Sequence, residues 1–371
     1  MLDTIKWKLE TLPGSGIWTG SADHTEMTAV KGTSLLGGMR FWTEALLRSF
    51  GHRVCDCIEG KEIFDRQAPE KICAACHSFG CTGLSRAFTL HVTQENMTEN
   101  REKTILKVTA PGREPAYYAF ASGWRGALTL SMSCRRPLSW PHEEHWRKNH
   151  AMLPPEVLLA TFLMLEYGAL GAHDQYGCGL VRLLNRDTLL PTLQSCSLPK
   201  DGSNTAEQGL ADLRDFFFFK GGLNRQQLER QSNCTVSSKD SGKRVPSSFA
   251  ATVRVRRLLN DSLRGQGASR TVRHWLCGSL KPETVGSHIS LGVSGETLYG
   301  WGWLPRAGIP GLSFSNKPSV RDTALNAVHA ALRGVCPELH WKEFASSRDA
   351  AAPKDWRQYV TEMIAQPWRD A

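Results

Sequence analysis

Cysteines gather in one short segment of the chain, and their spacing suits a metal ion. One residue separates Cys55 from Cys57. After fifteen further residues, Cys73 and Cys76 form a C-x2-C pair. Zinc binds four thiolate or imidazole ligands in a tetrahedron, and a C-x2-C turn supplies two of them. The segment therefore predicts a structural Zn2+ site, with ordinary unligated thiols as the alternative. Two nearby residues could each replace one of the four ligands: His52 and Cys81.

A second group of residues could bind a phosphate-sized anion. Lys31 directly precedes a segment with helical periodicity that begins near Ser34. Backbone N–H groups at the start of a helix, together with a lysine, attract a phosphate. Arg40, further along the same helix, adds a planar guanidinium that can donate two parallel hydrogen bonds. The alternative is an ordinary amphipathic helix whose glycines permit tight packing.

A glycine-rich turn spans residues 167–179 and holds four glycines. Backbone N–H groups of such a turn could cradle a phosphodiester, while the rings of His173 or Tyr176 stack on a base. The turn lacks the lysine of a P-loop and follows a helix, which excludes nucleoside triphosphate binding of that type. A plain connection between a helix and a strand explains the glycines equally well.

Arginines crowd a segment of the C-terminal half. Residues 253–257 alternate apolar and basic side chains, which predicts a strand with Arg254 and Arg256 on one face. Such a strand could line a groove for RNA, or it could be a solvated charged face. Two indoles among glycines at residues 300–306 could stack on bases or fill a core.

Regular elements predicted from periodicity place these groups. Apolar alternation predicts strands over 5–9, 88–92, 105–108, 128–132 and 180–184, and three- and four-residue spacing predicts helices over 34–50 and 156–167. The order of strand, helix, strands, helix and strand is typical of an α+β, ferredoxin-like β-α-β-β-α-β unit. We therefore expect a domain over residues 1–194, with the zinc-binding insertion at about residues 52–81.

The composition changes after residue 194. Ser, Asn, Gly and Lys dominate residues 195–248, so we expect an insertion or mobile arm over 195–275 that becomes basic toward its end. Phe216–Phe219 must nevertheless be buried. Residues 276–371, with helices predicted over 323–332 and 356–364, complete the fold as a C-terminal part. We find no internal repeat in the sequence.

Composition restricts the classes of function. The 371 residues carry 45 basic and 36 acidic side chains, a net charge of +9, which favours a polyanionic partner such as nucleic acid. The 41 % of hydrophobic residues suffices for a sizeable core. No apolar run is long enough to span a membrane, and residues 1–7 lack the apolar core of a signal peptide. We therefore expect a cytoplasmic protein that has no membrane partner, in keeping with the odd total of eleven cysteines.

The order of four short segments resembles the RAMP (repeat-associated mysterious protein) superfamily of CRISPR effector subunits. Residues 18–23 (WTGSAD), 31–42 (KGTSLLGGMRFW), 73–80 (CAACHSFG) and 168–179 (GALGAHDQYGCG) are similar to its sequence motifs in the same order. The second segment most resembles the first subunit of the type III-B (Cmr) effector. The cysteine segment is more similar to backbone subunits of types III-A and III-D. The resemblance covers about residues 1–185.

The resemblance implies an RRM-like fold with a protruding thumb, assembled with other subunits around a guide RNA. It implies that three residues contact RNA phosphates: Lys31, Ser34 and Arg40. It implies that three others lie where the glycine-rich loop meets RNA: His173, Gln175 and Tyr176. The chain departs from the family here, because His173, Asp174 and Gln175 replace the usual basic residues.

The function expected from these features is that of a CRISPR RNA-binding subunit of a type III effector ribonucleoprotein. Such a subunit binds guide RNA and the duplex of guide and target RNA in antiviral defence. One alternative is a metal-dependent endoribonuclease that cuts target RNA with Asp23 and Mg2+. Processing of precursor guide RNA by histidines is another. The third is a zinc-containing nucleic-acid-binding regulator. The histidines in question cluster in one segment: His142, His145 and His150.

Overall fold

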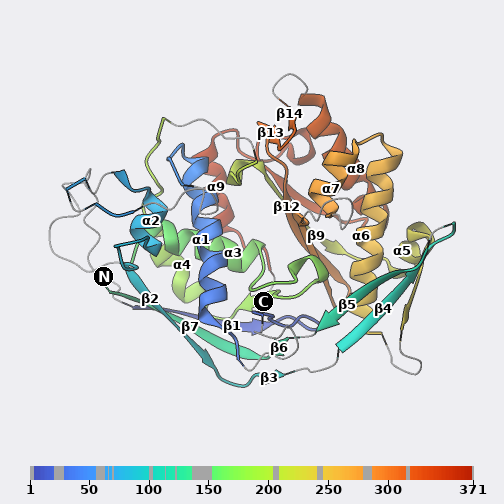
Figure 1. Ribbon diagram of the computed structural model, residues 1–371, viewed down its shortest axis with the longest axis horizontal. Coiled ribbons are helices and arrows are strands. Elements are labelled where there is room, and N and C mark those ends of the chain that lie inside the picture. The colour runs from blue at the N-terminus through green and yellow to red at the C-terminus, as the bar shows by residue number, and fades with distance from the viewer. Residues whose placement is uncertain are drawn as a thin grey trace.

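A computed structural model of the chain describes most of its residues and arranges them around two four-stranded sheets (Figure 1). The described residues are 4–20, 29–55, 63–65, 67–68, 71–99, 103–112, 114–121, 123–135, 153–203, 209–239, 245–278, 286–314 and 318–369. The mixture of helices and sheets confirms the predicted α+β class. Among these residues no helix is both long and apolar enough to cross a bilayer.

The first half of the chain forms an antiparallel sheet covered by two helices. In the sheet the strands lie in the order β2-β7-β1-β8. Helix α1 follows β1 in the chain, and helix α3 follows β7. The predicted order of strand, helix, two strands, helix and strand is therefore present. The bounds are β1 (Thr4–Thr11), α1 (Gly32–Ser49), β2 (Phe88–Gln94), β7 (Ala127–Cys134), α3 (Pro155–Tyr167) and β8 (Val181–Leu183).

The second half repeats this order of elements. Its sheet has the strand order β11-β12-β9-β15, and helices α6 and α8 occupy the chain positions of α1 and α3. Residues 195–275, expected to form an insertion or mobile arm, contribute both β9, an inner strand, and α6. The bounds are β9 (Phe216–Gly222), α6 (Ser247–Gly265), β11 (Ile289–Ser294), β12 (Thr297–Trp303), α8 (Pro318–Val335) and β15 (His340–Glu343).

The arginine-rich segment is helical, so the strand predicted over residues 253–257 is wrong. These residues lie in the middle of α6. Val255, Leu259 and Leu263 recur every fourth residue and are fully buried, which is helical spacing. The alternation over five residues was too short to distinguish the two structures, and the longer apolar spacing determines the outcome.

Helices α1 and α3 form a layer between the two sheets (Figure 1). Trp42 of α1 contacts the rings of Phe216 and Phe218 on β9 at centroid distances of 5.5 and 6.2 Å. Phe217 and Phe219 point the other way, into the core under α6 and α8. The run of four phenylalanines is therefore buried on both faces of its strand, as expected for a strand between two helical layers.

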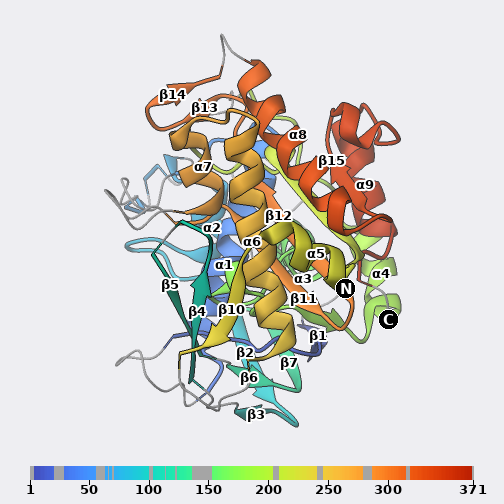
Figure 2. The ribbon, with the colours of Figure 1, turned by 90° about the vertical axis from the view of Figure 1, so that its right-hand side faces the viewer.

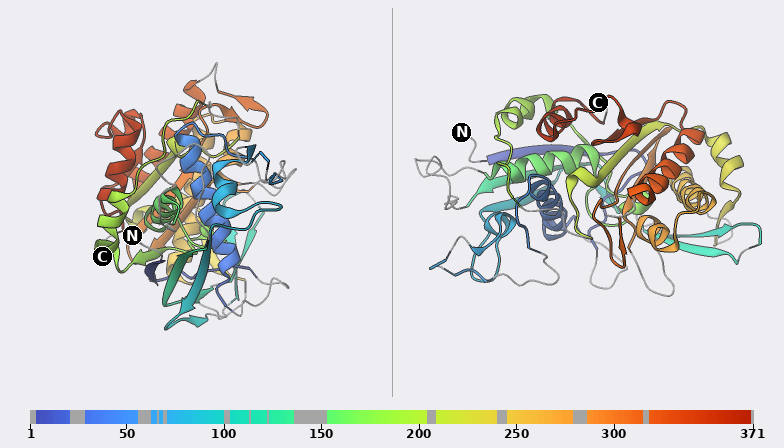
Figure 3. Two further views of the ribbon diagram at one scale, coloured as in Figure 1. Left: turned by 90° about the vertical axis from the view of Figure 1, so that its left-hand side faces the viewer. Right: turned by 90° about the horizontal axis from the view of Figure 1, so that it is seen from above.

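Two further connections join the halves. Strand β10 (Thr235–Ser238), which follows α5 (Arg225–Ser232) in the second half, pairs with β4 (Lys103–Thr109) of the first. Strand β4 also pairs with β5 (Ala116–Ala121), and Figure 2 shows the resulting three-stranded sheet beside α6. In the view from above, this sheet lies at one end of the long axis (Figure 3).

The C-terminal helix returns to the first half. Helix α9 (Trp356–Ala365) contributes to the same core as α1 and α3. The Tyr167 hydroxyl donates a hydrogen bond to the carbonyl of Met363 at 2.9 Å, and the Trp368 ring stacks on that of Tyr167. The end of the chain thus completes the first core. The remaining α-helices and strands of the described residues are α2 (Ala74–Phe79), β3 (Thr98–Glu99), β6 (Trp124–Arg125), α4 (Arg186–Ser195), α7 (Arg270–Cys277), β13 (Gly308–Ile309) and β14 (Leu312–Ser313).

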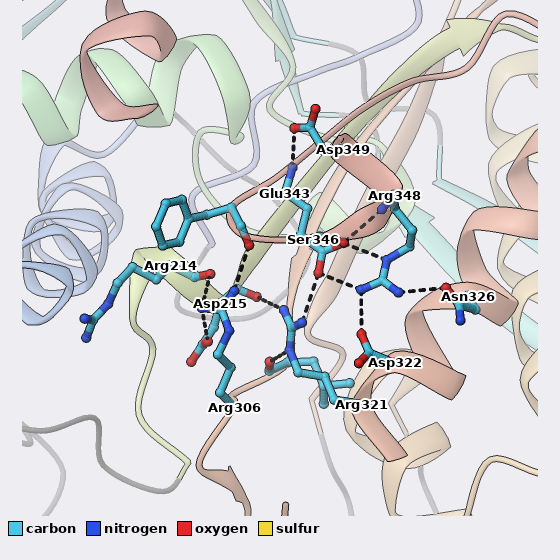
Figure 4. Close-up of polar contacts among 12 residues, drawn as sticks. Arg214, Asp215, Arg306, Arg321, Asp322, Asn326, Glu343, Ser346, Arg348 and Asp349 are labelled. Carbon is cyan, nitrogen blue, oxygen red and sulfur yellow. Dashed lines mark hydrogen bonds and ion pairs between the residues drawn. The ribbon is translucent and has the colours of Figure 1, made fainter. Parts of the chain in front are cut away.

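A buried ionic network fastens the edge of the second sheet (Figure 4). Glu343 of β15 is fully buried and accepts hydrogen bonds from Arg321 at 2.9 Å and from Arg348 at 2.8 and 2.9 Å. Arg306 donates to Asp215 at 3.2 Å and to the carbonyl of Phe344 at 2.8 Å. Each buried carboxylate therefore has a cationic partner, as a low-dielectric interior requires.

Replacing Glu343 with glutamine should lower the free energy of unfolding at pH 7 by about 3–5 kcal/mol, because the buried guanidinium of Arg321 loses its counter-charge and Arg348 keeps only its ion pair with Asp322. Burial raises the pKa of Glu343, but the hydrogen bond from Arg348 and the charges of Arg321 and Arg348 outweigh it and lower the pKa from 4.5 to about 2. A carboxylate with a depressed pKa stabilises the fold above its unfolded-state pKa, and this stabilisation disappears as the pH falls toward 2.

Urea denaturation of wild type and Glu343→Gln between pH 7 and pH 2 measures this difference. The gap should be constant above about pH 5 and should narrow steadily below it. Glu296→Gln is the matched control, since Glu296 pairs with Arg225 at the exposed surface and should cost no more than about 1 kcal/mol. If the difference in free energy of unfolding between wild type and Glu343→Gln does not change with pH, the pKa of Glu343 is not lowered in the folded protein.

Candidate functional site

Three segments of the chain, residues 18–19, 31–34 and 171–176, meet near the first residues of α1. We call this place the three-segment junction. The hydroxyl of Thr19 accepts a hydrogen bond from the Lys31 N–H at 2.9 Å. The Ser34 hydroxyl donates to the Thr19 carbonyl at 2.8 Å. On the other side, the Ala172 N–H of the glycine-rich loop donates to the Trp18 carbonyl at 2.6 Å. Residues 18 and 19 thus join the start of α1 to the glycine-rich loop.

Glycine is required where the loop meets Trp18. Gly171 has a φ of +81°, and a Cβ atom at this position would lie 2.2 Å from the Trp18 carbonyl oxygen. Any other residue would push the two backbones apart. The glycines predicted to cradle a phosphodiester therefore serve, at this position, to bring two chain segments together.

The predicted RNA-facing residues of the loop lie in a turn of 3-10 helix, Asp174–Tyr176, which follows His173. The His173 ring lies 5.8 Å from that of Trp18, between centroids. Burial lowers the pKa of His173 below its ordinary value of 6.5, although Asp174 acts in the opposite direction. The imidazole is therefore neutral at pH 7, so it offers a ring face and hydrogen bonds instead of a positive charge.

Arg256 of the second half reaches this same loop. Its Nη1 donates to the Gln175 carbonyl at 3.2 Å, and its guanidinium lies 5.5 Å from the centre of the Tyr176 ring. Its Nη2 donates to the Cys277 carbonyl at 2.7 Å. The structure thus brings three of the predicted residues together, with Arg256 bound to protein groups that fix the loop against α6.

Arg254 lies apart from them. Residues two positions apart on a helix point in nearly opposite directions. Arg254 accordingly forms an ion pair with Glu229 of α5, away from the glycine-rich loop. The prediction that both arginines share one face depended on the incorrect strand assignment.

The cysteine segment places three sulfur atoms around one point. Cys73 is the residue before α2, and its Sγ lies 3.4 Å from that of Cys55, which is also 3.4 Å from the Sγ of Cys76. All three sulfurs lie within 4.8 Å of one another. A tetrahedral site with zinc–sulfur bonds of about 2.3 Å sets sulfurs about 3.8 Å apart. The three thiols could therefore hold a metal ion.

The thiols also share protons in a way that suits a metal ligand. The hydrogen bond from Cys76 lowers the pKa of Cys73, even though burial acts to raise it. The same contact, together with burial, raises the pKa of Cys76. Cys73 is thus the thiol of this pair that deprotonates more easily, and a bound metal ion would displace the protons of all three thiols.

Three residues were predicted as candidates for the fourth ligand: Cys57, His52 and Cys81. Cys57 lies outside the described residues. Neither His52 nor Cys81 joins the group of sulfurs that lie within 4.8 Å of one another. The Nε2 atom of His52 is buried and has no hydrogen-bond partner among the described residues. Cys57, His52 and Cys81 therefore stay predictions.

The side chain of Arg40 extends from helix α1 to the sulfurs and not toward the three-segment junction. Its Nη2 lies 3.3 Å from the Sγ of Cys76 and 3.7 Å from that of Cys55. Its Nε donates to Glu44 at 2.7 Å. The sequence placed Arg40 with Lys31 and Ser34 as a phosphate ligand, and its side chain reaches a different place.

Some expected residues lie outside the described part of the chain, and others were missed. Asp23 and the histidine cluster at residues 142–150 belong to the first kind. Thr19 and Glu44 contribute to the site but were not predicted from the sequence. Thr19 stands within one of the four motif segments, which is the signal that could have identified it, whereas Glu44 carries only its i, i+4 spacing from Arg40.

Replacing Cys73 or Cys76 with serine should abolish metal binding, because a hydroxyl is a far weaker ligand than a thiolate for a soft ion. Metal content of the purified chain, measured by elemental analysis, should fall from about one ion per chain to less than a tenth. Cys196→Ser is the control, since Cys196 is half-buried outside the cluster. Full retention of metal by both cluster variants would exclude this site.

A comparison with known protein families gives a match in the first half of the chain. The family model of the RAMP superfamily matches residues 13–182. Among curated proteins there is no match. The crystal structure of apo Cmr1 from Pyrococcus furiosus is similar, with 12 % identity and a TM-score of 0.37, over 82 % of this chain and 90 % of that one.

A second similar structure is the cryo-EM structure of the type III-B Cmr-beta bound to cognate target RNA and AMPPnP. One of its chains has 8 % identity to this one and a TM-score of 0.43, over 88 % of this chain and 99 % of that one. Both TM-scores are below 0.5. The match to the RAMP superfamily over residues 13–182 contains the whole three-segment junction and the cysteine segment.

Proposed function

We propose that the chain is a CRISPR RNA-binding subunit of a type III effector ribonucleoprotein, where it binds guide RNA and the guide–target RNA duplex in antiviral defence. The observation that carries this proposal is the three-segment junction. Its three parts, residues 18–19, 31–34 and 171–176, all lie inside the span that matches the RAMP superfamily. Hydrogen bonds join them into one cluster, although about 150 residues separate the first segment from the third.

The fold supports this proposal. The strand order β2-β7-β1-β8, with α1 and α3 on one face, supports a ferredoxin-like (RRM-like) RAMP domain. The second half has the same order of elements and supports a second unit of this kind. Other subunits of the effector complex are the protein partners that such a role requires. The cytoplasm is the compartment proposed for it.

The charges at the junction indicate how RNA would bind. Lys31 is exposed at the first turn of α1, where backbone N–H groups also favour an anion. His173 is neutral at pH 7, and Arg256 is bound to protein carbonyls. Lys31 is therefore the cation we expect to contact a phosphate. Ser34, His173, Gln175 and Tyr176 supply hydrogen bonds and ring faces.

We propose a structural Zn2+ as the cofactor, held by Cys55, Cys73 and Cys76. Thiolates select soft or borderline ions such as zinc, and a buried site with four protein ligands has no open position for chemistry. Cys57 is the proposed fourth ligand, with His52 or Cys81 as its substitute.

Replacing Lys31 with methionine should weaken binding of single-stranded RNA and reduce its dependence on salt. Loss of one phosphate contact reduces the slope of log K against log salt concentration by about 0.7. Fluorescence anisotropy with a labelled guide RNA at several salt concentrations measures this slope. Lys8→Met is the matched control, because Lys8 is exposed on the face of β1 opposite the helices and should leave the slope unchanged. Equal slopes for both variants would exclude the junction as the RNA site.

The role in an effector complex requires a separate experiment. The chain is purified together with the proteins of its genomic neighbourhood, and the bound RNA is sequenced. Short RNAs with a repeat-derived end support the proposal, and an assembled complex without them contradicts it. Addition of complementary target RNA with Mg2+ then compares wild type with Asp23→Ala. Loss of one cut site in the variant would assign that cleavage to Asp23, and unchanged cutting would leave the chain as a binding subunit.

A further inference from the structure

We propose that Arg40 is the cationic partner of a metal–thiolate centre at Cys55, Cys73 and Cys76, and that it attaches this centre to helix α1. This inference rests on the metal site proposed above. It gives Arg40 a role different from the phosphate contact that the sequence predicts. It goes beyond the proposed function because it couples the metal centre to the helix whose first turn is the proposed RNA site.

The geometry around the guanidinium supports this role. All three of its nitrogens face protein groups. Nη2 lies 3.3 and 3.7 Å from two of the sulfurs, Nη1 lies 3.5 Å from the carbonyl oxygen of Gly80, and Nε donates to Glu44 at 2.7 Å. Glu44 is itself buried on α1 and fixes the direction of the arginine. A phosphate could engage the fork only after these contacts had broken.

Charge balance gives the reason for such a partner. A divalent ion bound by three thiolates and one neutral ligand has a net charge of −1, and with four thiolates the charge is −2. Cys73 and Cys76 are buried, and a buried negative charge is costly unless a cation or hydrogen-bond donors neutralise it. Arg40 provides both a charge and N–H donors to two sulfurs. Groups that hydrogen bond to metal ligands in this way adjust the affinity for the ion.

Arg40, Glu44 and Arg48 lie four residues apart on the same face of α1, and their charges alternate in sign. Glu44 lies 3.6 Å from Arg48, between the closest atoms of the pair. Arg48 in turn donates to the backbone carbonyl of Cys55 at 3.4 Å. Arg40 and Arg48 therefore both contact the cysteine segment, Arg40 through the sulfurs and Arg48 through the backbone, and Glu44 between them pairs with both arginines. The metal centre and the helix are thus expected to be ordered together.

The test uses the full chain and Co2+ as the metal probe, because a Co2+–thiolate centre has a sulfur-to-metal charge-transfer band. Arg40→Met should weaken Co2+ binding by about 10–100-fold, measured by competition with a chelator. The band should move to longer wavelength, since a sulfur without its N–H donor holds its electrons less tightly. Arg40→Lys, which keeps the charge and loses the fork, should recover part of the affinity.

Lys31→Met is the matched control, because it removes a charge at the start of the same helix and, among the described residues, Lys31 has no hydrogen bond to a sulfur. It should leave the affinity for Co2+ and the charge-transfer band unchanged, while it weakens RNA binding. Metal-loaded Arg40→Met should keep the wild-type dependence of RNA binding on salt. This crossed pattern separates the role of Arg40 from a general effect of helix charge.

Several results would overturn the inference. Unchanged Co2+ affinity and an unchanged band in Arg40→Met, or a reduced salt slope for RNA in that variant, would return Arg40 to the phosphate site. If Arg40→Met does not fold, Arg40→Lys decides, and wild-type affinity together with a wild-type band in it would contradict the proposal. Wild-type chain that binds no Co2+ would remove the metal site itself. Wild-type chain that binds Co2+ but no RNA would overturn the proposed function and leave this inference intact.

Discussion

The burial of α1 and α3 between two sheets is the constraint on which the rest of the structure depends. Every residue of α3 from Val157 to Tyr167 is buried, so this helix has no solvent face. A helix that is apolar on all sides can exist only where neighbours cover it completely. The first sheet covers one side and the aromatic face of the second sheet covers the other. Neither half of the chain could expose this layer without a large loss of hydrophobic stabilisation.

Helix α1 belongs to this buried layer and also positions the residues of the candidate site. Its first turn belongs to the three-segment junction, Arg40 reaches the sulfurs, and Trp42 packs on the second sheet. The packing at Trp42 is tight, because a Cβ atom at Gly168 would lie 2.5 Å from its ring. A rise of about 1.5 Å per residue puts Ser34 and Trp42 about 12 Å apart along one rigid element. The first turn of α1, the cysteine cluster and the contact between the halves are therefore held at fixed distances.

The sequence predicted the first half well because its elements are amphipathic in the simple sense. In β1, buried Ile5, Trp7 and Leu9 alternate with exposed residues, and α1 shows three- and four-residue spacing. The second half lacks such signals. Phe216–Phe219 are buried on both faces of β9, so no alternation marks the strand, and arginines interrupt the apolar pattern of α6. The repeat of the two units lies in the strand order, which pairwise residue similarity does not reveal.

In the candidate site, too, only the groups that have a local sequence pattern could be predicted. Spacing alone indicated the cysteine cluster, since a C-x2-C pair must bring its sulfurs together. The partner of Arg40 could not be predicted in this way, because Cys76 is 36 residues away and meets it only after the segment has folded back on α1. Thr19 is similar, because its contacts to α1 depend on a loop whose course the sequence does not specify.

The second half also supports the glycine-rich loop, which explains why Arg256 contacts protein instead of solvent. Gly177 of the loop faces Gly292 of β11, and a Cβ atom on Gly292 would lie 2.5 Å from the Cα of Gly177. Arg256 fixes the same loop through Gln175 and Tyr176. The loop is thus held by Trp18 on one side and by the second sheet on the other. A shift between the two halves would have to move this loop relative to the start of α1, so the layer that α1 and α3 form also preserves the shape of the proposed RNA surface.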